Sequence, residues 1–193
     1  MDDHSPTERS TRVYTGRVIN LDIDRVRFPD GTTGELEIIR HPGASAIVPV
    51  VGAWQAKDPM LVLIRQYRYA AGGYVYEIPA GRLNDGEDPA TCAERELAEE
   101  TGYRAGRMEH LYTMFTTPGF TDEKIHVFLA EDLTAGAMAH EPDEFMSVEK
   151  MPMSSALTLV RNGTISDSKT ALAILYVATF RLNVDGTNRL NSQ

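Results

Sequence analysis

One segment near the middle of the chain, residues 81–103, limits the possible folds more than any other part of the sequence. It reads GRLNDGEDPATCAERELAEETGY. Asp88 is a suitable N-cap, and Pro89 suits the first turn of a helix. Gly102 suits a C-terminal stop, so the segment predicts a helix over Pro89–Thr101. Three apolar residues at helical spacing would pack this helix on a core: Ala90, Ala93 and Leu97.

The predicted helix also carries glutamates on one face. Glu96, Glu99 and Glu100 stand at i, i+3 and i+4, so their carboxylates project from neighbouring positions. Like charges this close repel one another, and a divalent cation among them would offset that repulsion. Arg95 lies four residues before Glu99 and is placed to orient its carboxylate by a charge-assisted hydrogen bond. The alternative interpretation is a solvated acidic helix face.

Runs of strand length lie on both sides of this helix. Apolar or alternating residues predict strands at about 12–19, 23–28, 34–40, 44–51, 60–66, 74–78, 108–115 and 124–129. Two more helices are expected, a short one from Ser154 or Ser155 to Asn162-Gly163 and a last one over about Ser168–Leu182. The pattern predicts an α+β or mixed α/β/α sandwich with an N-terminal antiparallel β-sheet region.

We expect one folded domain with flexible ends. Residues 1–11 and 186–193 are expected to be tails, residues 12–42 to form the N-terminal strands, and residues 43–185 to form the main domain. Residues 134–143 are expected to be a flexible loop.

Composition narrows the function classes. The 193 residues are 42% hydrophobic and 24% charged, which is typical of a folded domain. The formal net charge of -9 argues against nucleic acid as a partner, because nucleic-acid binding needs a basic face. The single cysteine, Cys92, allows no internal disulfide, and no apolar run is long enough to span a membrane. A cytoplasmic protein is therefore expected.

The segment 81–103 resembles the Nudix box, G-x5-E-x7-R-E-U-x-E-E-x-G-U, in which U is a bulky apolar residue. Its fixed positions are matched by Gly81, Glu87, Arg95, Glu96, Leu97, Glu99, Glu100 and Gly102. Tyr103 fills the last, usually aliphatic position with an aromatic residue. A full match by chance in a chain this long has a probability on the order of one in ten million, so the resemblance is specific.

Three further segments are similar to Nudix enzymes that hydrolyse ADP-ribose and nucleoside diphosphate sugars. Residues 77–81, EIPAG, resemble the family's E-x-P-A-G, and residues 65–68, RQYR, resemble its R-Q-[YF]-R strand. Residues 117–123, TPGFTDE, resemble S-P-G-F-[ST]-D-E. The resemblance implies substrate-binding residues in these segments: Arg68, Glu77, Gly81, Pro118 and Gly119. Many members carry an arginine where this chain has Leu36, so a substrate contact there is either lost or moved to Arg40.

The resemblance also implies a chemistry. Magnesium, or manganese as a substitute, would be bound by the carbonyl of Ala80 and by Glu96, Glu99 and Glu100. Arg95 and Glu99 would act in catalysis, and a loop carboxylate would act as base. Glu141, Asp143 and Glu144 are the candidates for that base, and Glu144 is preferred. Lys169 and Thr170 match a D-S-K-T-like stretch of the family, for which capping and packing are expected.

The family implies the products AMP and ribose 5-phosphate for ADP-ribose. It also implies a homodimer in which residues 12–42 exchange between subunits around the catalytic domain, 43–185. Three alternatives remain open. They are another substrate, such as GDP-mannose or an oxidised nucleotide, a module that binds ADP-ribose without hydrolysis, and a purely structural interaction protein.

Overall fold

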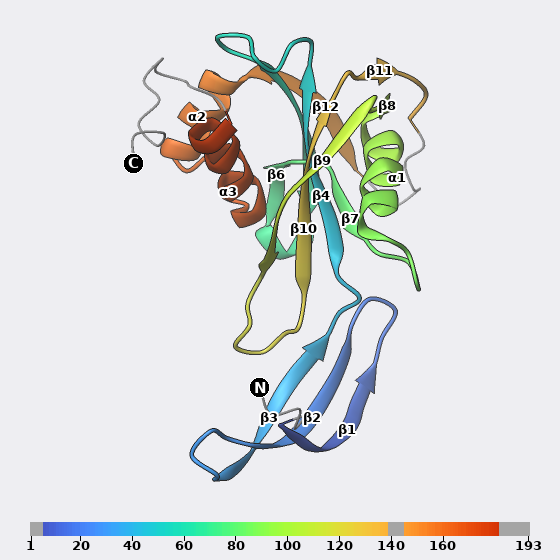
Figure 1. The fold of residues 1–193 in the computed structure, drawn as a ribbon, viewed down its shortest axis with the longest axis vertical. Coiled ribbons are helices and arrows are strands. Elements are labelled where there is room, and N and C mark those ends of the chain that lie inside the picture. The colour runs from blue at the N-terminus through green and yellow to red at the C-terminus, as the bar shows by residue number, and fades with distance from the viewer. Residues whose placement is uncertain (1–5, 139–144, 182–193) are drawn as a thin grey trace.

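Two separate β-sheets organise the chain (Figure 1). The computed structural model describes residues 6–138 and 145–181. An N-terminal sheet contains β1 (Thr7–Thr15), β2 (Asn20–Arg27) and β3 (Thr33–Arg40) in that order, all antiparallel. It lies at one end of the molecule, beside the tip of the β9–β10 hairpin.

The larger sheet has seven strands and forms the centre of the main domain. Its main path runs β12-β5-β4-β10-β9, with β6 paired to β5 and β7 paired to β4. The bounds are β4 Ala44–Val51, β5 Met60–Arg68, β6 Gly73–Glu77, β7 Ala80–Arg82, β9 Arg107–Phe115, β10 Lys124–Glu131 and β12 Met146–Pro152. Strands β4 and β10 are parallel, and the other pairs are antiparallel. A small ladder joins β8 (Tyr103–Arg104) to β11 (Thr134–Ala135).

Helices cover both faces of the central sheet, and this explains the uninterrupted apolar runs of its middle strands. Along β4, Ala46 and Val48 face one core, whereas Ile47 between them faces the other. Strands buried on both faces need apolar residues at every position. Helix α1 (Pro89–Thr101) covers one face through Ala93 and Leu97. Helices α2 (Met153–Arg161) and α3 (Ser168–Tyr176) cover the opposite face, on the other side of the sheet in Figure 1.

The predicted sandwich with an N-terminal antiparallel sheet is confirmed, and several boundaries are corrected. Strand β1 starts at Thr7 rather than Arg12 and ends at Thr15, because its register with β2 runs from Thr7↔Val26 to Thr15↔Asn20. Strand β12 was not predicted from the sequence. It alternates apolar and polar residues only weakly and is held by pairing with β5 along Met60–Gln66.

The last two described helices lie close to their predicted positions. Helix α3 continues as a five-residue π-helical stretch, Val177–Arg181, where the described chain ends. In the expected loop, Thr134–Ala135 pairs with β8, and residues 139–144 lie outside the described residues.

No helix in the described parts of the chain is both long and apolar enough to cross a membrane.

Candidate active site

Helix α1 positions the acidic face predicted from the sequence. Asp88 caps the helix, because its carboxylate accepts hydrogen bonds from the Ala90 N–H at 2.9 Å and the Thr91 N–H at 3.4 Å. Gly102 ends the helix in the left-handed conformation with φ of 72°. The apolar stripe fixes the rotation of the helix, and this leaves Glu96 and Glu100 nearly buried and Glu99 half-exposed.

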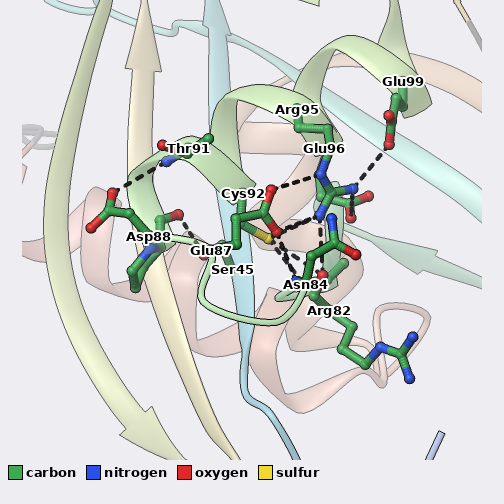
Figure 2. Close-up of polar contacts among 12 residues, drawn as sticks. Ser45, Arg82, Asn84, Glu87, Asp88, Thr91, Cys92, Arg95, Glu96 and Glu99 are labelled. Atoms are coloured by element: carbon green, nitrogen blue, oxygen red, sulfur yellow. Dashed lines mark hydrogen bonds and ion pairs between the residues drawn. The ribbon is translucent and has the colours of Figure 1, made fainter.

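Arg95 ties the acidic face to the preceding loop (Figure 2). Its guanidinium donates to both carboxylate oxygens of Glu87 at 2.9 Å. It also donates to Glu96 at 2.5 Å and to Glu99 at 3.0 Å. These hydrogen bonds to carboxylates raise the pKa of Arg95 well above its ordinary value, with Glu87 making the largest contribution. One arginine therefore sets the position of three box glutamates at once.

Strand β7, which precedes the loop into α1, is held against the same helix. The Ala80 N–H donates to the Glu100 carboxylate at 2.9 Å, so Glu100 already contacts the residue whose carbonyl was predicted to bind metal. A Cβ on Gly81 would overlap the carboxylate of Glu96, so a larger residue here would displace the end of that side chain. Below the loop, the buried Cys92 thiol donates to the carbonyls of Gly81 and Arg82 at 3.6 Å. Burial raises the pKa of this thiol to about 11, which keeps it neutral at physiological pH.

Arg68 and Glu77 form a second charged group at the edge of the site. Arg68 donates from Nε and Nη2 to the two Glu77 carboxylate oxygens at 2.7 and 3.0 Å. Burial alone would raise the pKa of Glu77, but hydrogen bonds from Arg68 and the charge of Lys169 outweigh it, so this pKa is lowered. The carboxylate is 3% exposed, whereas the Arg68 side chain is 43% exposed. Of this predicted pair, only Arg68 reaches the site directly.

A cleft of about 580 Å³ joins these groups. The predicted residues that line it are Arg68, Ala80, Gly81, Arg95, Glu96, Glu99 and Glu100. A second hollow of about 400 Å³ lies beyond the other end of β4, around Trp54 and Arg107. It contains none of the predicted site residues, so the cleft at α1 is the candidate active site.

The cleft also contains residues that sequence reasoning missed. They are Arg17, Val18, His41, Gln66, Tyr67, Arg82 and Asn84. Arg17 and Val18 come from the β1–β2 turn, which reaches the main domain where Arg82 donates to the Arg17 carbonyl at 2.9 Å. Four of them could have been found in advance, because Gln66 and Tyr67 lie inside the segment RQYR, and Arg82 and Asn84 lie inside the segment 81–103. Arg17 and Val18 line the cleft because the β1–β2 turn packs on the main domain.

None of the residues 117–123 lines this cleft, although Asp122 and Glu123 contact His41, which does. Pro118 and Gly119 are exposed in the β9–β10 turn and do not line the cleft. The turn docks on β3 instead, with the Ile39 N–H donating to the Phe120 carbonyl at 2.8 Å. The substrate-binding role of Pro118 and Gly119 stays a prediction. So does the role of the loop base, because Glu141, Asp143 and Glu144 lie outside the described residues.

Arg40, to which the sequence suggested that a substrate contact had moved, is held by carboxylates in this structure. It forms ion pairs with the buried Asp22 at 3.1 Å and with Asp122 at 3.2 Å, and it also pairs with the buried Asp24. Its guanidinium is therefore occupied by carboxylates of the N-terminal sheet and the β9–β10 turn. Arg40 is not among the residues that line the cleft.

The donor set of the cleft fits a magnesium ion that is bound together with a substrate. Within residues 6–138 and 145–181, no three His, Cys, Asp or Glu side chains are grouped so that they could hold a metal ion by themselves. Instead, the Arg95 guanidinium donates hydrogen bonds to Glu96 and Glu99, and the Glu100 carboxylate accepts one from the Ala80 N–H. Magnesium usually takes only one or two protein carboxylates and fills its other positions with water and substrate phosphates. Hard oxygen donors facing an open cleft suit that mode of binding.

Comparisons with known proteins agree with the motif. A family model described as the NUDIX domain matches residues 43–171. The ADP-ribose pyrophosphatase of Bacillus subtilis (strain 168) is 39% identical over 168 residues, covering 86% of this chain and 88% of that protein. The methanol dehydrogenase activator of Bacillus methanolicus is 39% identical over 173 residues, covering 89% of this chain and 91% of that protein. The GDP-mannose pyrophosphatase of Escherichia coli O139:H28 (strain E24377A / ETEC) is 35% identical over 170 residues, covering 79% and 86% respectively.

A solved structure supports the fold. The crystal structure of an ADP compounds hydrolase superposes with a TM-score of 0.71 over 90% of this chain and 95% of that chain, at 21% identity. The family match spans the whole loop and helix that build the acidic side of the cleft. The chain therefore belongs to the Nudix family and is a Nudix hydrolase.

Proposed function

We propose that this chain hydrolyses the pyrophosphate bond of ADP-ribose, giving AMP and ribose 5-phosphate, with magnesium as cofactor and manganese as a substitute. The observation that carries the proposal is the cleft, which brings the carboxylates of α1 and the guanidinium of Arg68 to one cavity. The relative from B. subtilis, named as an ADP-ribose pyrophosphatase and matched over 86% of this chain, supports this choice of substrate.

The metal would be held by the acidic side of the cleft. Glu96 and Glu100 are the expected main ligands, with Glu99 and the Ala80 carbonyl completing the set. When bound, magnesium supplies positive charge that offsets the charge developing on the phosphates in the transition state. The close fit of Gly81 against Glu96 supports this assignment, because it places the Glu96 carboxylate directly at β7, next to Ala80.

The remaining roles belong to residues of the chain itself. Arg95 orients Glu96 and Glu99, which it already contacts. Arg68 binds a phosphate or the terminal ribose, and Gly81, which also lines the cleft, contacts the substrate. A loop carboxylate, for which Glu144 is the preferred candidate, takes the proton of the attacking water. Pro118 and Gly119 are also expected to contact the substrate, as the resemblance to the family implies.

The variant Glu100→Gln tests the acidic side of the cleft. We expect turnover at saturating magnesium to fall by about 100-fold or more, because the amide is a weaker ligand for a hard cation. The measurement is kcat for ADP-ribose over a magnesium titration, with the thermal midpoint recorded to show that the variant folds. The exposed Glu94→Gln on the same helix is the matched control and should keep wild-type turnover. Full magnesium-dependent activity in Glu100→Gln would contradict the proposal.

A substrate panel decides between ADP-ribose and the alternatives. The E. coli relative is named as a GDP-mannose pyrophosphatase, which makes GDP-mannose the second candidate. The panel therefore includes ADP-ribose, GDP-mannose and an oxidised nucleotide, each assayed with magnesium in oxygen-18 water. Products that carry the label identify the bond that breaks and the phosphorus attacked. Tight binding of ADP-ribose without products would favour a binding module instead.

The functional unit is expected to be a homodimer in the cytoplasm, with the N-terminal strands exchanged between subunits. Exposed apolar side chains on and next to β1, namely Val13, Tyr14 and Val18, support a further contact for this sheet. Light scattering of the purified protein tests the assembly. A monomer with normal activity would exclude the exchanged dimer as the working form.

A further inference from the structure

Helix α3 reaches the active site through one lysine. Lys169, in its first turn, forms ion pairs with the Glu77 carboxylate and with Asp167, the latter at 3.0 Å. Its side chain is only 14% exposed, although a lysine is seldom buried without a charged partner. Its contact with Glu77 is therefore a specific interaction and not a solvated surface charge.

Glu77 connects this lysine to the cleft. Its carboxylate is 3% exposed, and its oxygens form ion pairs with Arg68 on one side and with Lys169 on the other. The three side chains form a row of cation, anion and cation that starts at α3 and ends at the cleft. A buried carboxylate needs its charge balanced and its oxygens hydrogen-bonded, and Lys169 contributes to both.

The next residue of α3 holds the same part of the chain. The Thr170 hydroxyl oxygen, which is completely buried, accepts a hydrogen bond from the Ile78 N–H at 2.9 Å. This hydroxyl also donates to the Asp167 carboxylate at 2.5 Å, and Asp167 caps the helix through the Thr170 N–H at 3.0 Å. The start of α3 thus contacts two consecutive residues, Glu77 and Ile78, just before strand β7, which begins at Ala80.

We propose that Lys169 is a positioning residue for substrate binding, which acts through Glu77 to hold the Arg68 guanidinium at the cleft. This inference rests on the proposed function, in which Arg68 binds the substrate. Without Lys169, the Glu77 carboxylate loses one of its two cationic partners and its fixed orientation. Arg68 then follows Glu77 away from the geometry that meets the substrate.

A double-mutant cycle between Lys169 and Arg68 tests this role. Lys169→Met removes the charge and keeps most of the aliphatic stem. We expect KM for ADP-ribose to rise by about tenfold, the effect of losing one charged hydrogen bond, while kcat changes by less than about threefold. In the Arg68→Ala background, Lys169→Met should change KM by less than about twofold, because the residue through which it acts is gone.

Three further variants make the result specific. Lys169→Arg keeps a cation and should retain a KM within about threefold of wild type. Lys150→Met removes an exposed lysine that contacts the Tyr103 ring, and it should leave KM unchanged. Lys169→Gln keeps a donor without charge and replaces Lys169→Met if that variant does not fold. Thermal midpoints of all variants separate a loss of stability from a loss of binding.

Two results would overturn the assignment. One is an unchanged KM in Lys169→Met and Lys169→Gln, and the other is an equal KM effect of Lys169→Met with and without Arg68. If the wild-type protein hydrolyses none of the nucleoside diphosphate sugars, the proposed function fails on its own. The same cycle is then measured as the affinity for ADP by titration calorimetry, with the same criteria.

Discussion

At the scale of single residues, the contact between Gly81 and Glu96 gives the sharpest expectation. Gly81→Ala would place a methyl group on the Glu96 carboxylate, so the glutamate must move away from the loop. We expect kcat to fall by about 10- to 100-fold and the unfolding free energy by about 1–3 kcal/mol. Gly73→Ala is the control, because a Cβ there meets no atom within 4 Å. Equal kcat values of the two variants would show that the close approach of Gly81 and Glu96 is not needed for activity.

Glu87 gives a pH-dependent expectation at the same scale. Hydrogen bonds from Arg95, and then from the Asn84 N–H, lower the pKa of Glu87 from 4.5 to about 2. A lowered pKa stabilises the folded state fully above the ordinary pKa, and this stabilisation is lost as the pH falls through the folded value. Glu87→Gln should therefore be less stable than wild type at pH 7, with a difference that shrinks below about pH 4.5 and is small near pH 2.

Urea unfolding at pH 7, 5 and 3 measures this difference. The exposed Glu94→Gln on α1 serves as the control and should show no comparable trend. A stability difference for Glu87→Gln that stays constant down to pH 3, or grows there, would contradict the assigned ion pair with Arg95.

At the scale of elements, the N-cap of α1 is expected to stabilise the helix that carries the acidic face of the site. Asp88→Ala removes the acceptor for two N–H groups and should cost about 1 kcal/mol of unfolding free energy. For a chain of this size, that corresponds to a fall of the melting temperature by about 2–4 °C. Differential scanning calorimetry measures it. Asp85→Ala, an exposed change of the same charge in the same loop, should leave the melting temperature unchanged.

At the scale of the whole molecule, Arg40 joins the N-terminal sheet to the main domain. Arg40→Ala leaves Asp22 and Asp24, both nearly buried, with fewer or no cationic partners and removes the link to Asp122. We expect the N-terminal sheet to lose about 2–3 kcal/mol of local stability while the central sheet keeps its own. Hydrogen exchange of the β2 and β3 amides measures this loss.

The control for this prediction is another arginine of the same sheet. Arg25 pairs with Glu8 at 3.4 Å on the surface. Arg25→Ala should therefore change the free energy of local opening, as obtained from hydrogen exchange, by less than about 0.5 kcal/mol. Because the β1–β2 turn lines the cleft, Arg40→Ala should also raise KM. Unchanged exchange in β2 and β3 would show that the sheet is held by other contacts.

The sequence predicted those elements whose capping residues are their direct neighbours in the chain, and those strands whose side chains are buried on both faces of the sheet. The bounds of α1 follow from Asp88 and Gly102, and those of β4 from its apolar run, because capping and two-sided burial leave a direct trace in the residue types. Strand β12 left no such trace, since its place is fixed by pairing with β5. The start of β1 was missed because its first residues, TERST, are polar and nearly all exposed, so no apolar pattern marks them as a strand.

By itself, the sequence determined the chemical identity of the site. The spacing of Glu96, Glu99 and Glu100 on one helix turn, with Arg95 beside them, needs only helix geometry to become an acidic face. The tertiary structure alone decided which other groups meet that face. It buried Glu77 behind Arg68, brought Lys169 to its far side, and placed Arg17 at the cleft. These contacts join residues far apart in the chain, and only the packing of sheets and helices sets their distances.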